Sequence, residues 1–69
     1  MKPLSIRVNG ELRDVEQGTT IIDLLAHLGI RPDRVAVEMN RAIVKQPLWA
    51  ETKVPPEAEL EIVQFVGGG

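Results

Sequence analysis

The feature that most constrains this chain is a single short stripe of aliphatic side chains at helical spacing. The stripe consists of Ile21, Leu24, Leu25 and Leu28. Thr20 fits the N-cap position with Asp23 as its capping-box partner, and Gly29 followed by Pro32 ends the segment. A helix of about ten residues is only marginally stable in water by itself. We therefore expect this helix to bury its stripe against a sheet.

Two strand patterns precede the helix. They span residues 4–8 and 11–16. Asn9-Gly10 between them is a strong signal for a two-residue turn, because both residues tolerate a positive φ. Such a turn places Val15 opposite Leu4 and leaves Leu12 on the other face, unless a bulge shifts the register.

The strands expected after the helix are residues 35–39, 42–44 and 59–66. Asn40-Arg41 predicts a turn between the first two, although arginine resists a positive φ. Prolines bound the irregular connection that follows, and Trp49 within it is expected to cover an edge of the core. The order strand, strand, helix, strand, short strand, strand indicates an α+β roll of the β-grasp type. Its mixed sheet of four to five strands would pack on one α-helix.

Composition excludes several classes of function. The chain has 69 residues, no cysteine and a net charge of −2, which indicates one domain without disulfides, thiolate-bound metal or a cysteine-held iron–sulfur cluster. No cluster of basic residues points to nucleic acid, and the apolar runs are too short to span a membrane. The first residues lack the apolar core of a signal peptide, so we expect a cytoplasmic protein.

Catalytic residues are not apparent. His27 is the only histidine and Ser5 the only serine, so neither a metal site nor a catalytic triad can be assembled from them. Glu57, Glu59 and Glu61 are interpreted as a solvated face rather than as paired catalytic carboxylates. We expect that the protein is not an enzyme and binds no metal.

The last three residues, Gly67-Gly68-Gly69, follow the final strand directly. We predict a domain over residues 1–66 and a flexible tail over residues 67–69. The tail is either a frayed end or linker remnant, or a working part that enters a narrow channel, since glycine lacks Cβ. In the final strand, Val63 and Phe65 are expected on the sheet face opposite the helix, as a surface for a partner unless the Trp49 connection covers them.

The whole chain resembles the ThiS family, the sulfur-carrier proteins of thiamin (thiazole) biosynthesis. The resemblance rests on residues 20–25, 35–40, 49–52 and 61–63 and on the terminal Gly-Gly. Asn40-Arg41 and residues 55–57 depart from the turns that are usual in this family. Wider relatives are MoaD, the small subunit of molybdopterin synthase, and ubiquitin.

The resemblance implies a sulfur carrier that is the substrate of other enzymes and holds no bound cofactor. A ThiF-like adenylating enzyme would use ATP to adenylate the carboxylate of Gly69. A persulfide enzyme would then supply sulfur for a thiocarboxylate, and a ThiG-like thiazole synthase would accept that sulfur. Gly67 and Gly68 would give the tail its slim backbone. Val63 and Phe65, with Val66, would dock the body, which is expected to be a monomer when free.

Other functions remain open at this point. A MoaD-like subunit of molybdopterin synthase would share the fold, the tail and the thiocarboxylate. A ubiquitin-like modifier would instead form isopeptide bonds with target lysines. A plain β-grasp binding module would not need its glycines at all. The sequence does not choose between activating enzymes or sulfur acceptors.

Overall fold

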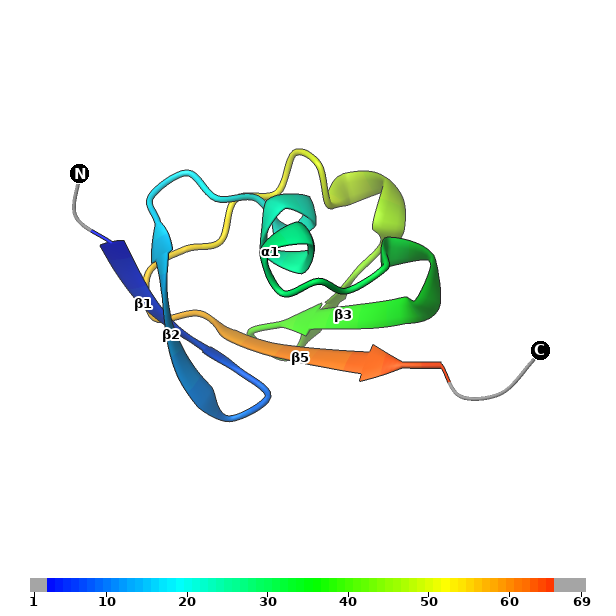
Figure 1. Cartoon of the computed structure of the whole chain (residues 1–69), viewed down its shortest axis with the longest axis horizontal. Coiled ribbons are helices and arrows are strands. Elements are labelled where there is room, and N and C mark those ends of the chain that lie inside the picture. The colour runs from blue at the N-terminus through cyan, green and yellow to red at the C-terminus, as the bar shows by residue number, and fades with distance from the viewer. Residues whose placement is uncertain (1–2, 66–69) are drawn as a thin grey trace.

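The structure is a computed structural model that describes residues 3–65. Its elements are β1 (Pro3–Val8), β2 (Glu11–Glu16), α1 (Ile21–His27), η1 (Pro32–Arg34), β3 (Val35–Met39), β4 (Ala42–Val44), η2 (Gln46–Leu48) and β5 (Glu59–Gln64). The strands form one sheet in the order β2-β1-β5-β3-β4. It is a mixed sheet, because β1 and β5 are parallel and the other neighbouring pairs are antiparallel. Helix α1 lies across one face of it (Figure 1). The predicted β-grasp roll is confirmed.

Helix α1 is fixed at both ends by local hydrogen bonds. The Thr20 hydroxyl accepts from the Asp23 N–H, and the Asp23 carboxylate accepts from the Thr20 N–H, each at 3.2 Å. At the other end, the N–H of Gly29 donates to Ala26 at 3.1 Å and that of Ile30 donates to Leu25 at 2.9 Å. These two bonds form a Schellman motif with Gly29 at a positive φ of 72°. The regular helix has seven residues, so the predicted length of about ten residues is wrong.

The core is aliphatic apart from one indole. Its buried members are Ile6, Val8, Ile21, Leu24, Leu25, Val35, Val37, Trp49, Val54, Ala58, Leu60 and Ile62. The expectation that Trp49 covers an edge of the core is wrong, because Trp49 is only 2% exposed and belongs to the core itself. Its Nε1–H donates to the carbonyl of Val44 at 2.7 Å, which satisfies the polar atom of a buried ring.

The first hairpin has the register that its two-residue turn predicts. Leu4 pairs with Val15, and Arg7 pairs with Leu12, with continuous pairing along the hairpin. No bulge is needed, and Leu12 is 66% exposed on the face opposite α1.

The second hairpin turns at Asn40 and Arg41, whose φ values are 52° and 71°. Both central residues therefore have the positive φ of a two-residue hairpin turn, and Arg41 adopts it despite its side chain.

Strand β5 lies at the centre of the sheet, between β1 and β3. It ends at Gln64, two residues before the predicted end, and Val66 lies outside the described residues. The N–H of Phe65 still donates to the carbonyl of Arg34 at 2.8 Å. In Figure 1 the strand runs past the helix and points away from the β1–β2 hairpin. The chain thus leaves the domain from the middle of its sheet.

Candidate functional site

The predicted docking residues lie at the end of this central strand. Val63 is 60% exposed and Phe65 is 61% exposed. Because side chains alternate along a strand and Ile62 is buried, Val63 lies on the face opposite α1. We call this the open face. The connection around Trp49 leaves both residues uncovered. Val66 and residues 67–69, which were also predicted as site residues, lie outside the described part of the chain.

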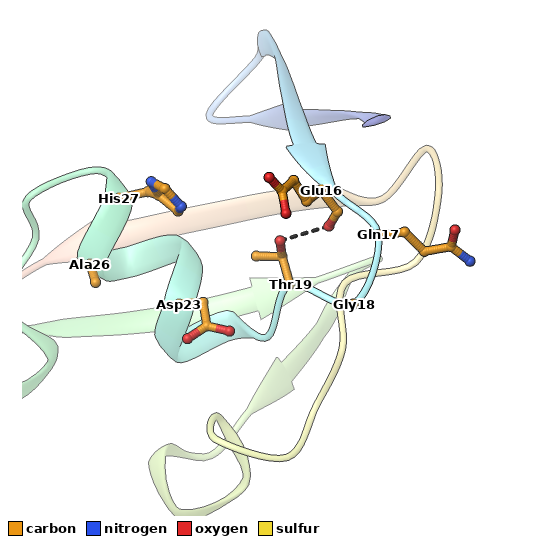
Figure 2. A pocket seen from close by; sticks show the side chains of 7 residues that line it. All are labelled: Glu16, Gln17, Gly18, Thr19, Asp23, Ala26 and His27. Atoms are coloured by element: carbon orange, nitrogen blue, oxygen red, sulfur yellow. Dashed lines mark hydrogen bonds between the residues drawn. The ribbon is translucent and has the colours of Figure 1, made fainter. Parts of the chain in front are cut away.

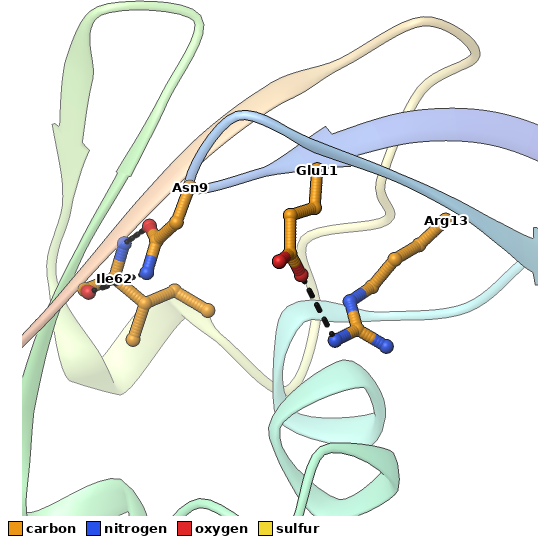
Figure 3. A network of polar contacts seen from close by, with 4 residues as sticks. All are labelled: Asn9, Glu11, Arg13 and Ile62. Carbon is orange, nitrogen blue, oxygen red and sulfur yellow. Dashed lines mark hydrogen bonds and ion pairs between the residues drawn. The ribbon is translucent and has the colours of Figure 1, made fainter.

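The side chain of Asn9 extends the pairing of β1 with β5. The parallel pairing itself covers only Arg7 with Glu59 and Val8 with Leu60. Beyond it, the N–H of Ile62 donates to Asn9 Oδ1 at 2.7 Å, and Asn9 Nδ2 donates back to the Ile62 carbonyl at 3.2 Å (Figure 3). The side-chain amide therefore replaces the backbone of a neighbouring strand where β1 has already turned.

Asn40 performs the same function from the other side. Its N–H donates to the carbonyl of Glu59 at 2.8 Å, and its Oδ1 accepts from the Glu59 N–H at 2.9 Å. The two hairpin turns thus hold β5 from both flanks through asparagines in the left-handed conformation. Sequence reasoning predicted both turns and missed this use of their side chains. The available signal was asparagine as the first residue of each turn.

Apolar residues from three strands share the open face with Val63. Ala36 of β3 is in register with Val63, and Glu38 is in register with Ile43 of β4. Ile43 is 73% exposed, and these residues border a shallow hollow of about 170 Å³. Sequence reasoning missed Ile43, because its position on the open face near Val63 depends on the pairing of β4 with β3 and of β3 with β5.

A hollow beside helix α1 offers little chemistry. It has a volume of about 480 Å³ and lies between the end of β2 and α1 (Figure 2). The hydroxyl of Thr19 donates to the Glu16 carbonyl at 2.6 Å, and Asp23 belongs to the helix cap. His27 lies on its wall, and the hydroxyl among the lining residues, that of Thr19, is engaged by the Glu16 carbonyl. The polar groups here stabilise the loop and the helix end.

Other candidates for chemistry are equally limited. Ser5 Oγ donates to Asp14 at 3.2 Å on an exposed part of the first hairpin, where no histidine completes a catalytic set. Among residues 3–65, no three His, Cys, Asp or Glu side chains are placed to hold a metal ion. No helix in this described range is long and apolar enough to cross a membrane.

Comparison with protein families gives a match over nearly the whole chain. The model of the ThiS family matches residues 6–69. The chain belongs to the ThiS family. Membership confirms the resemblance seen in the sequence and agrees with the ubiquitin-like fold described above.

Solved structures of ThiS proteins agree with this assignment. The crystal structure of a thiamine biosynthesis protein, ThiS, from Geobacter metallireducens superposes with a TM-score of 0.79 at 26% identity. That match covers 96% of this ThiS-family chain and 100% of the other. A solution structure of a thiamine biosynthesis protein from the same organism gives a TM-score of 0.76.

Sequence relatives include two much longer proteins. Thiazole synthases of Magnetococcus marinus and Paramagnetospirillum magneticum are each 39% identical to this chain over 66 residues. The match covers 96% of the chain and only 20% of each synthase. A protein of Porphyra purpurea called ycf40 is 31% identical over 68 residues, which is 96% of its length.

Proposed function

We propose that this ThiS-family protein carries sulfur as a thiocarboxylate on Gly69 and delivers it to a thiazole synthase. The observation that carries the proposal is the exposed apolar pair Val63 and Phe65 at the end of the central strand. In the sequence, only Val66 separates this pair from the glycines. A partner that contacts the pair also meets the start of the tail.

The chemistry explains why the carrier needs another enzyme. An α-carboxylate, with a reference pKa near 3.5, is ionised at neutral pH and is a poor electrophile. Attack of this carboxylate on the α-phosphate of ATP, in a ThiF-like enzyme, releases pyrophosphate and leaves an acyl adenylate. The terminal sulfur of an enzyme persulfide then displaces AMP. A thiol cleaves the resulting acyl disulfide and leaves the thiocarboxylate.

The tail has the length and the slimness for this route. Residues 67–69, if extended, span about 10 Å. Gly67 and Gly68 have no side chains to meet the walls of a channel. Docking through Val63, Phe65 and Val66 would place the reactive carbonyl inside the partner.

The thiazole synthase relatives support the choice of acceptor. Each contains a segment similar to this chain within a single long polypeptide. A carrier domain joined to its acceptor gives a high effective concentration of the tail. We propose that the present chain meets a thiazole synthase as a separate protein.

A bulky residue in the tail tests the route directly. Replacing Gly68 by Val should block entry into the adenylating enzyme and reduce ATP–pyrophosphate exchange by at least about a hundredfold, since misplacing a reacting group by about 1 Å costs that much. Thermal unfolding should be unchanged, because the substitution comes four residues after the last residue of β5 in the sequence. Normal exchange and thiocarboxylate formation by Gly68→Val would contradict the channel.

A further inference from the structure

The open face carries two glutamates directly opposite each other. Glu38 of β3 is in register with Glu61 of the central strand β5. Like charges directly opposite each other on neighbouring strands destabilise a sheet. Neither of the two ion pairs found among residues 3–65 involves them.

The strands on either side bring no cation into that row. On one flank, Glu38 is in register with Ile43. On the other flank, the pairing of β1 with β5 has ended at Val8. Arg7 is in register with a different acid, Glu59. Among residues 3–65, no ion pair therefore offsets the Glu38–Glu61 repulsion.

The two carboxylates border apolar surface. Ala36, Glu38, Ile43, Glu61 and Val63 line the shallow hollow of about 170 Å³, which we call the acidic hollow. Ile43 and Val63 are 73% and 60% exposed. Val63 also belongs to the predicted docking pair, so the acidic hollow continues that surface along β5 away from the tail.

We propose that the acidic hollow receives an arginine side chain from the protein that accepts the sulfur, an inference that rests on the function proposed above. A guanidinium has five N–H donors for carboxylates and apolar faces that pack on aliphatic groups. Bound between Glu38 and Glu61, it removes their repulsion and contacts Ile43 and Val63. The same contact aligns β5 with the entrance that the tail must reach.

The test measures binding of the full-length carrier to purified thiazole synthase at low and high salt. The double variant Glu38→Gln/Glu61→Gln should raise Kd about tenfold at low ionic strength and flatten the salt dependence, as expected for lost charge complementarity. The control Glu16→Gln/Glu51→Gln makes the same charge change at exposed positions outside the acidic hollow. Its Kd should match that of the original protein.

A second readout separates function from folding. The Glu38→Gln/Glu61→Gln variant should be more stable than the original, with a Tm higher by about 1–5 °C, because the facing charges are gone. Binding and stability should thus change in opposite directions. Ile43→Gln, at a highly exposed position, should also weaken binding without lowering Tm.

Each remaining outcome is decisive. If the original protein binds thiazole synthase and the double variant binds equally well at both salt concentrations, the arginine contact is excluded and the proposed function stands. If the original protein does not bind thiazole synthase at all, the proposed acceptor is wrong, and this inference fails with it.

Discussion

At the scale of single residues, the hairpin turns concentrate the strain of this small domain. Within residues 3–65, four residues other than glycine have a positive φ, namely Asn9, Asn40, Arg41 and Glu57. Asparagine tolerates this conformation, and both asparagines here also bind the backbone of β5. Arg41 has no such compensation among its described contacts, so the turn includes one residue that is poorly suited to its backbone.

Replacing Arg41 by Gly should therefore stabilise the fold. Relief of about 1–2 kcal/mol of left-handed strain outweighs the backbone entropy of about 0.5–1 kcal/mol that glycine loses on folding. The expected gain is about 0.5–1 kcal/mol in urea unfolding. Arg41→Ala is the control, since it removes the charge and keeps Cβ. An equal gain in both variants would show that charge, rather than φ, is responsible.

Asn9 permits a cleaner separation of conformation from hydrogen bonding. Asn9→Gly keeps the positive φ and removes both bonds to Ile62, whose N–H is partly buried. We expect a loss of about 1–3 kcal/mol, the cost of leaving such a group unpaired. Hydrogen exchange at the Ile62 amide should accelerate more than at core amides of β3. Unchanged exchange at Ile62 would mean that the Asn9 bonds contribute little.

At the scale of elements, α1 depends on its cap because it has only seven residues. Thr20→Ala removes the side-chain acceptor for the Asp23 N–H and should cost about 1 kcal/mol of stability. Thr20→Ser retains the hydroxyl and should behave like the original protein. Thermal unfolding followed by circular dichroism measures both. Equal losses in the two variants would assign the effect to the methyl group instead of the cap.

The elements also show how far sequence patterns reach. The β1–β2 register was predictable because a two-residue turn and the alternation of Leu4 and Val15 fix it locally. The burial of Trp49 was not predictable in this way, since its place in the core depends on how an irregular connection folds back onto the domain. The sheet face of Val63 and Phe65 followed from strand alternation, whereas their exposure also required that the Trp49 connection leave them uncovered. The acidic hollow could not be predicted from strand alternation, because its residues come together only when β3 lies between β4 and β5.

At the scale of the whole molecule, the sheet supports one strand from both sides. Asn9 and Asn40 bind β5 on opposite flanks, and the core face of that strand is buried through Leu60 and Ile62. The strand so held leads toward the glycines. We therefore propose that the chain consists of a body that fixes where the tail starts and a tail that carries the reactive group on Gly69.

The most direct test of this account is the intact mass of the protein isolated from the cell that makes it. We expect a species heavier by the difference between one sulfur and one oxygen, located by fragmentation on Gly69 and lost on alkaline hydrolysis. Blocking the adenylating enzyme should abolish that species. If cells actively making thiamin contain only the unmodified carboxylate, or the sulfur is found elsewhere in the chain, the proposal of a thiocarboxylate carrier is contradicted.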